Sequence, residues 1–116
     1  MILIMSGRYQ GEREFAENHF PGKSIFSKNV SETAEEFLQN RFKTNSIIDD
    51  TARELSSKIL LEKTDIILCH IVGCGVVPID EKQRFQAELI GRASCLLAKQ
   101  AAEVWVVRAG IGERIK

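Results

Sequence analysis

The sequence predicts an α/β domain with a small, mostly parallel β-sheet and flanking helices. Short apolar segments of strand length are separated by longer segments whose apolar residues recur at helical spacing. The clearest apolar segments lack polar alternation, which is typical of parallel strands covered on both faces. The resulting order of strand, helix, strand, helix and strand is that of a parallel sheet with helical crossovers.

Length and charge narrow the class of protein. The chain of 116 residues corresponds to one domain, residues 1–116. Its 16 basic and 16 acidic residues give a net charge of zero, which argues against a nucleic-acid-binding protein. No apolar run reaches the roughly 18 residues of a membrane helix, so no membrane partner is expected. Cys69, Cys74 and Cys95 lack C-x-x-C spacing, which favours a protein of the reducing cytoplasm without disulfides.

The first quarter of the chain predicts a strand, a turn and a helix. Residues 1–5 are apolar and end at Ser6-Gly7, as expected of a buried strand followed by a turn. A helix is expected over 12–18, and Pro21-Gly22 ends it. Residues 24–26 are expected to form a short second strand.

Two further helices are expected in the middle of the chain, each preceded by a serine that can cap its first turn. Ser31 precedes two acidic residues suited to the positive end of a helix, and Ser46 precedes the pair Asp49-Asp50. The expected inward faces are Ala34, Phe37, Leu38 and Phe42 for the first helix and Ile48, Ala52, Leu55 and Ile59 for the second.

The rear half predicts two buried strands around the longest helix. Residues 65–69 and 104–107 are the strands, because both are apolar without alternation. The helix is expected over 81–101, where one stripe of its surface is apolar. The chain closes with a turn and a final short strand, marked by Gly110, Gly112 and Ile115.

The turn after the first strand stands where α/β proteins bind phosphate, because backbone N–H groups and the helix dipole both point at the anion there. The pattern of such a loop is G-x-x-x-x-G-K-[ST], in which Lys reaches the outer phosphates and the hydroxyl holds Mg²⁺. In the frame 6–13, Gly11 is present, but Ser6 replaces the first glycine. Glu12 replaces the lysine, and Arg13 replaces the hydroxyl residue.

Charge decides what this turn can bind. A carboxylate about 4 Å from a phosphate oxygen costs about 4 kcal/mol at an effective dielectric constant near 20. Arg8 and Arg13 can offset part of this repulsion, but neither replaces a hydroxyl that binds Mg²⁺. Two interpretations stay open: a plain strand–turn–helix junction, or an anion-binding turn formed by Gly7, Arg8, Gly11 and Arg13.

A second glycine cluster, Gly73 and Gly75, follows the strand at 65–69. We expect it on the carboxyl edge of the sheet, where open α/β sheets bind ligands. It is either a tight strand–helix connection or a ligand loop. His70 precedes the cluster and is the candidate catalytic residue, acting as a base or a ligand.

The remaining polar groups have simpler interpretations. The acidic pairs Asp49-Asp50 and Asp80-Glu81 lie near predicted helix starts, where carboxylates stabilise the helix dipole. A metal site from Cys69, His70 and Cys74 would lack a fourth ligand, so no metal site is expected.

Segments at both ends of the chain share the motifs of one family. The front carries M-I-L-I at 1–4, Gly7, Gly11 and F-A-E at 15–17. The rear carries V-G-C-G-V-V-P at 72–78, Arg84, Gly91-Arg92, Leu97-Ala98, A-E-V-W-V-V at 102–107, A-G-I at 109–111 and Lys116. In these segments the sequence resembles the bifunctional adenosylcobinamide kinase/adenosylcobinamide-phosphate guanylyltransferase family of cobalamin biosynthesis.

The resemblance implies a P-loop NTPase-like sheet and a homo-oligomer, with a trimer as the expected form. Enzymes of this family phosphorylate adenosylcobinamide with a nucleoside triphosphate and then transfer GMP from GTP through a histidine-bound intermediate. GTP or ATP is therefore the implied nucleotide and a corrinoid the implied second ligand, while the residue types at 12 and 13 argue against bound Mg²⁺. The residues expected to contact the nucleotide are Gly7, Arg8, Gly11, Arg13, Gly73 and Gly75.

The sequence also departs from the family pattern. The Asn-Glu before the glycine cluster is His70-Ile71, and the Asn-Gln after Gly-Arg is Ser94-Cys95. The middle of the chain is much shorter than in the family, and neither the acidic metal-binding strand nor the guanylylated histidine can be placed in it. The two histidines, His19 and His70, do not match the position of that nucleophile.

Three hypotheses follow. The one we favour is a degenerate member that keeps the fold and a nucleotide or corrinoid contact but has lost kinase chemistry. The second is an active kinase/guanylyltransferase whose charge work is done by Arg8, Arg13 and His70. The third is a non-catalytic partner subunit of a full-length enzyme, held by apolar surface that the short middle leaves exposed.

Overall fold

The computed structural model describes residues 1–41, 48–70 and 80–116, and it confirms an α/β fold with a mostly parallel sheet and flanking helices. Within these residues the sheet consists of β1 (Ile2–Ser6), β2 (Ile66–His70), β3 (Glu103–Arg108) and β4 (Ile111–Arg114). The strands lie in the order β2-β1-β3-β4. β1 pairs in parallel with both β2 and β3, and β4 runs antiparallel to β3.

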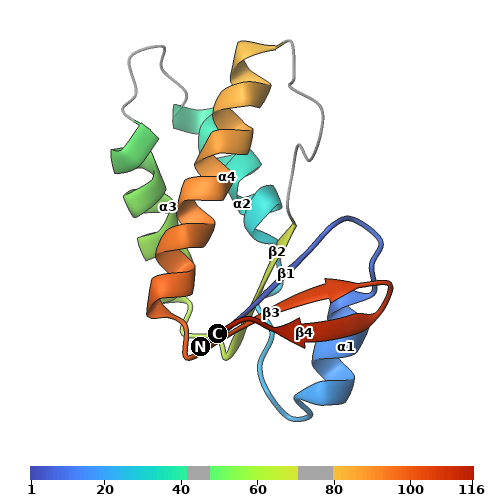
Figure 1. The fold of residues 1–116 in the computed structure, drawn as a ribbon. Helices are drawn as coiled ribbons and strands as arrows, with labels where there is room; N and C mark the ends of the chain where they lie inside the picture. The colour runs from blue at the N-terminus through green and yellow to red at the C-terminus, as the bar shows by residue number, and fades with distance from the viewer. Residues whose placement is uncertain (42–47, 71–79) are drawn as a thin grey trace.

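The helices lie on both faces of the sheet. They are α1 (Glu12–His19), α2 (Val30–Arg41), α3 (Ile48–Leu61) and α4 (Glu81–Gln100). Figure 1 shows α2, α3 and α4 grouped on one side of the sheet and α1 on the other. Among the described helices, none is both long and apolar enough to cross a membrane.

The position of β1 between two cores explains why its sequence has no polar alternation. Leu3 packs into the core shared with α2, α3 and α4, and Ile4 packs into the smaller core on the side of α1. Both side chains are fully buried, at 0% exposure. Because β1 is covered on both faces, each of its side-chain directions requires an apolar residue. The predicted buried strands at 1–5 and 65–69 are therefore confirmed. The strand predicted at 104–107 is present as β3, but only Val104 and Val107 of it are buried.

The predicted strand at 24–26 is wrong. Ile25 makes one isolated parallel bridge to Ile66, and no strand continues from it. Its neighbours bracket that residue, since Phe26 N donates to Ile66 O at 2.8 Å and Ile66 N donates to Ser24 O at 2.9 Å. The chain then turns away into α2, so the segment covers one end of β2 without becoming a fifth strand.

Two helix caps test the predicted helix starts. Asp80 caps α4 as predicted, because its Oδ1 accepts a hydrogen bond from Lys82 N at 2.9 Å. Ser31, however, is not the cap of the preceding helix, since α2 already begins at Val30. Asn29 takes that role, and its Oδ1 accepts from Ser31 N at 3.1 Å. Phe42 and the other predicted cap, Ser46, lie outside the described residues.

The C-terminal turn is shifted from its predicted place. The turn is formed by Ala109 and Gly110, whose φ angles are 49° and 76°. Gly112 lies inside β4, and Ile115 lies just beyond its end, so the predicted positions of both were wrong. Gly112 is required for packing: a Cβ there would overlap the ring of Phe15 on α1.

Lys116 caps the carboxyl end of α4, and its removal is expected to destabilise the fold. Its Nζ donates to Ala98 O at 2.8 Å and to Ala101 O at 2.7 Å, which are carbonyls at the negative end of the helix. Lys116→Met should lower the free energy of unfolding by roughly 0.5–1 kcal/mol. Urea denaturation measures the change, with Lys99→Met as the matched control because Lys99 is an exposed cation in the same last turn. Equal effects of both substitutions would contradict the cap.

Candidate functional site

A cleft of about 490 Å³ lies where β1 and β2 end, at the carboxyl edge of the parallel strands. Open α/β sheets bind ligands at this edge. The cleft is bounded by the turn between β1 and α1, by the start of α2 and by the last residue of β2. Its lining residues are Arg8, Tyr9, Gly11, Glu12, Arg13, Glu14, Ser31, Glu32 and His70.

The β1–α1 turn is fixed against the turn between β3 and β4. Gln10 makes both contacts: its backbone O accepts from Gly110 N at 2.7 Å, and its Oε1 accepts from Ala109 N at 2.7 Å. Gly11 has φ +76° and lies so close that an added Cβ would be 3.6 Å from Gly110 Cα. The second glycine of the predicted loop is therefore favoured by its left-handed backbone conformation, whereas an added Cβ would make only an ordinary van der Waals contact with Gly110.

A hydrogen-bonded carboxylate–histidine pair occupies the inner wall of the cleft. His70 Nε2 lies 2.6 Å from Glu12 Oε1, and the two side chains are 18% and 14% exposed. Their proximity follows from the sheet register, in which Ser6 at the end of β1 stands opposite His70 at the end of β2. His70 is thus the last residue of β2, so the strand predicted at 65–69 extends one residue further than expected.

Several groups act on the Glu12 carboxyl. Burial alone would raise its pKa, but a hydrogen bond from His70, one from its own backbone amide, the charge of His70 and the nearby Ser6 hydroxyl lower it. The net result is a pKa below the ordinary value of 4.5. The carboxylate is therefore ionised at neutral pH, inside the turn where the loop pattern has a lysine.

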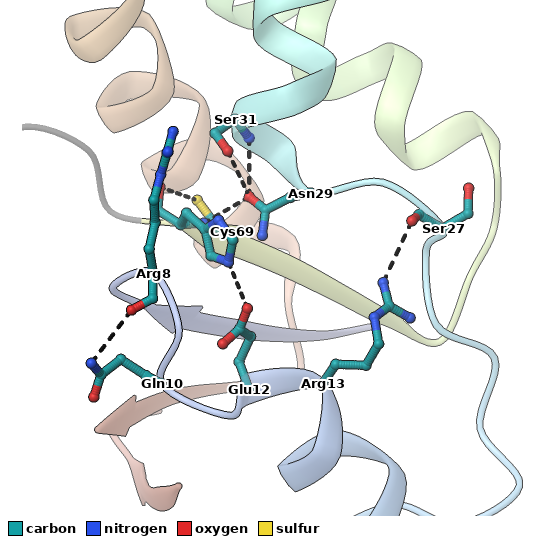
Figure 2. Close-up of polar contacts among 9 residues, drawn as sticks. Arg8, Gln10, Glu12, Arg13, Ser27, Asn29, Ser31 and Cys69 are labelled. Carbon is teal, nitrogen blue, oxygen red and sulfur yellow. Dashed lines mark hydrogen bonds and ion pairs between the residues drawn. The ribbon is translucent and has the colours of Figure 1, made fainter. Parts of the chain in front are cut away.

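Asn29 holds this pair from the side of α2. Its side chain is buried, and its Oδ1 accepts three hydrogen bonds: from His70 N at 2.8 Å, from Ser31 Oγ at 3.0 Å and from Ser31 N at 3.1 Å. Figure 2 shows Asn29 and Ser31 above the Glu12 carboxylate, with dashed lines converging on the Asn29 oxygen. One amide oxygen thus joins the first turn of α2 to the end of β2.

Two arginines line the outer part of the cleft. Arg13 extends from α1 toward the segment before α2, and its Nη2 donates to Ser27 O at 3.4 Å (Figure 2). The Arg8 guanidinium has no hydrogen bond or ion pair among the described residues, and the residue is exposed. The cleft therefore has the Glu12 carboxylate inside and a rim of mixed charge, on which Arg8 and Arg13 lie together with the exposed acidic residues Glu14 and Glu32.

The Glu12 carboxyl predicts a pH dependence of stability. Its pKa is lower in the folded state than in the unfolded chain, so its contribution is present above about pH 4.5 and is lost as the pH falls through the folded-state pKa. Glu12→Gln should therefore be less stable than the wild type at neutral pH, and the two stability curves should converge in acid. Urea unfolding between pH 3 and 7 measures this, with Glu14→Gln as the charge-matched control from the same helical turn. A Glu12→Gln curve that stays parallel to the wild type into acid would contradict the prediction.

Most of the predicted site residues come together. Arg8, Gly11, Arg13 and His70 line the cleft, and Gly7 lies in the same turn just after β1. The other two predicted glycines, at 73 and 75, lie outside the described residues.

The metal site considered from the sequence gains no support from the described residues, which contain no cluster of metal-ligating side chains. Burial raises the pKa of the Cys69 thiol to about 12, so this thiol is neither a ready thiolate nor an accessible ligand. Cys74, its predicted companion, lies outside the described residues.

Sequence reasoning missed Gln10, Asn29 and the pairing of Glu12 with His70. The pairing had a usable signal. Two strands of a mostly parallel sheet were predicted to end near Ser6 and Cys69, and parallel strands end at the same edge of a sheet. Had these strands been taken as neighbours, as they are in the structure, the residues that follow them would have been expected to meet. Asn29 gave no comparable signal, because its three contacts depend on where α2 docks.

A larger groove of about 810 Å³ lies between α2 and α3, away from these residues. Two of the charges that line it are already paired, Glu36 with Lys28 and Arg53 with Asp50. It contains none of the residues that the sequence singles out for chemistry. We therefore take the smaller cleft at the strand ends as the candidate site.

Known proteins show a partial similarity. No family model matches the chain. Over 51 residues, or 44% of this chain, the sequence is 39% identical to the bifunctional adenosylcobalamin biosynthesis protein CobU of Salmonella typhimurium. The protein of the same name from Escherichia coli is also 39% identical over 51 residues. The match spans 28% of the length of each of these curated relatives, so it supports a distant relation to cobalamin biosynthesis proteins.

Proposed function

We propose that this protein is a degenerate, P-loop-like relative of the adenosylcobinamide kinase/guanylyltransferase family that binds a nucleotide or a corrinoid and has lost kinase chemistry. The partial similarity to two bifunctional adenosylcobalamin biosynthesis proteins supports the relation. The parallel sheet, with a glycine turn leading from its central strand into a helix, supports a retained ligand edge.

The observation that carries the loss of chemistry is the position of Glu12. Phosphoryl transfer depends on cations that position the phosphates and neutralise their charge. Here a carboxylate replaces the cation at the start of α1, and His70 holds it in place at 2.6 Å. Since the carboxylate is ionised and mostly buried, it cannot simply turn into solvent when an anionic ligand arrives.

Ligand binding is assigned to the outer cleft. Arg8 and Arg13 line it and are both exposed, so their guanidinium groups are available to a phosphate or to a carboxylated or phosphorylated corrinoid side chain. An anion bound at the rim lies outside the turn at the start of α1, which is where kinase chemistry would hold the phosphates.

Calorimetric titration of the purified protein with GTP, ATP and adenosylcobinamide, each with and without Mg²⁺, tests the proposal. We expect binding of at least one of these ligands, a tenfold weaker affinity in Arg8→Ala combined with Arg13→Ala, and no effect of Lys99→Ala. Lys99 is a suitable control because it is an exposed cation at the opposite edge of the sheet. A parallel assay should find no phosphorylation of adenosylcobinamide, and robust turnover would refute the lost chemistry.

One observation favours a second candidate, an active transferase with relocated groups. The Glu12–His70 pair and two arginines line the same cleft, and a carboxylate-oriented histidine is a common acid–base device. In that case the turnover assay gives activity, and Arg13→Ala combined with His70→Ala abolishes it. Activity that survives the double substitution would exclude this candidate.

A further inference from the structure

The start of α1 has hydrogen-bond donors that its own cap residue does not satisfy. Gly11 stands at the N-cap and provides no side-chain hydrogen bond to the first turn. The amides of a first helical turn have no partners within the helix and attract anions. Instead of a cap, the Glu12 carboxylate bends back onto its own amide while it accepts a hydrogen bond from His70 Nε2.

A second observation comes from the strand that leads into the turn. Ser6 is 1% exposed, and its Oγ is buried with no hydrogen-bond partner among the described residues. A buried hydroxyl without a partner is unfavourable and calls for an explanation. This hydroxyl lies near the Glu12 carboxylate, beyond the range of a formed hydrogen bond yet close enough to stabilise its charge. Ser6 continues the row of Ile2 and Ile4, and His70 the row of Ile66 and Leu68, whose side chains lie on the α1 face of the sheet. Both side chains therefore face the start of α1.

We propose that Ser6 Oγ, His70 Nε2 and the first amides of α1 form a binding site for a tetrahedral oxyanion such as a phosphate group, and that the Glu12 carboxylate of the chain itself fills this site. The proposal rests on the proposed function only in taking the cleft as the ligand site. It states further that the inner part of the cleft keeps its anion-binding donors and is closed by an internal anion.

The donors explain why a phosphate group fits. They come from three elements, the end of β1, the end of β2 and the start of α1. His70 Nε2 and the Glu12 amide contact the carboxylate, and the Ser6 hydroxyl lies beside it without a hydrogen bond. A carboxylate has only two oxygens to accept hydrogen bonds, and here the Ser6 hydroxyl forms no hydrogen bond with this group or with any other described residue. A tetrahedral anion has further oxygens and can reach all three sides of such a site.

Removing the Glu12 side chain should open the site. Glu12→Ala deletes both the filling carboxylate and its charge, while the donors of Ser6, His70 and the helix start remain. Glu14→Ala is the matched control, because Glu14 is also an acidic residue of the first turn of α1 and lies exposed at the cleft. The two variants have the same net charge, so a difference between them reports the site and not general electrostatics.

Calorimetry with inorganic phosphate at pH 7.5, supported by ³¹P line broadening, measures the effect. We expect Glu12→Ala to bind phosphate at least tenfold more tightly than the wild type and Glu14→Ala, and to lose most of that gain when Ser6→Ala or His70→Ala is added. Should Glu12→Ala not fold, Glu12→Ser is measured against the same criterion. Equal affinity in the wild type and the Glu12 variant, or an equal gain in Glu14→Ala, overturns the proposal.

Two further comparisons complete the test. The first identifies the source of the phosphate group, and the second separates failure of this proposal from failure of the proposed function. GTP binding to Glu12→Ala that exceeds phosphate binding by tenfold assigns the site to the end of a nucleotide, whereas equal binding assigns it to free phosphate. If the wild type binds GTP or ATP but the Glu12 variant gains no phosphate site, the internal anion is refuted and the proposed function stands. If the Glu12 variant gains a phosphate site while the wild type binds no nucleotide or corrinoid, the internal anion stands and the proposed function is refuted.

Discussion

Gly112→Ala is expected to lower the free energy of unfolding by about 2–3 kcal/mol, because the added methyl group overlaps the ring of Phe15. That ring cannot move away without cost. It lies between the stacked ring of His19, with centroids 5.1 Å apart, and that of Trp105 at 5.7 Å. The substitution should therefore separate α1 from β4 and disturb the aromatic cluster. Urea denaturation followed by Trp105 fluorescence measures both effects in one experiment.

Gly91→Ala is the matched control. Gly91 lies in α4, and an added Cβ there would meet no atom within 4 Å. An alanine in a helix interior is favoured over glycine by about 0.5–1 kcal/mol, so this variant should be slightly more stable than the wild type. Similar losses in both variants would mean that glycine-to-alanine changes act through something other than the contact with Phe15.

Asn29→Ala is expected to destabilise the fold by about 2–4 kcal/mol, because it removes a helix cap and leaves the donors of Ser31 and His70 without their acceptor. The loss should also release the backbone at His70 and weaken its contact with Glu12. Chemical denaturation gives the stability, and the imidazole proton signals of His70 in NMR spectra report the change at the cleft.

Two other asparagine substitutions serve as controls for the expected loss of stability. Asn29→Asp keeps an acceptor oxygen and a good cap, so its loss should stay below about 1 kcal/mol. Asn18→Ala changes an exposed residue of α1 and should shift stability by less than about 0.5 kcal/mol. If Asn29→Ala behaves like Asn18→Ala, the amide oxygen does not hold the two elements together.

The fold was predictable where burial leaves a periodic pattern. Strands β1 and β2 lie between two cores, so their apolar runs were unambiguous, and α4 shows its stripe in Leu89, Ala93 and Leu97. The errors fall where tertiary contacts decide. Residues 24–26 have the composition of a strand, but they pair with the edge of β2 only through a single bridge between Ile25 and Ile66. Gly112 suggested a turn, yet its missing side chain makes room for Phe15.

The site was predictable in its location and less so in its contacts. The sequence put Arg8, Gly11 and Arg13 in the turn after the first strand, and these residues line one cleft because the geometry of that turn is local in sequence. The wrong sign of charge at Glu12 was also visible from the sequence. What holds that charge was not, since His70 comes from a distant strand and approaches through the register of the sheet.

The antiparallel strand β4 has a consequence for aggregation. Ile115 N donates inward to Val104 O, so by alternation the amides of Gly112 and Arg114 point away from β3. Two copies that joined these outer edges by two-fold antiparallel pairing would use the outward amides of both Gly112 and Arg114 when Gly112 lies opposite Arg114. That register places Glu113 directly opposite Glu113 of the second copy, and like charges in such pairs are destabilising. This repulsion, reduced by the ion pair of each Glu113 with Arg108, disfavours that register of edge-to-edge pairing between two copies.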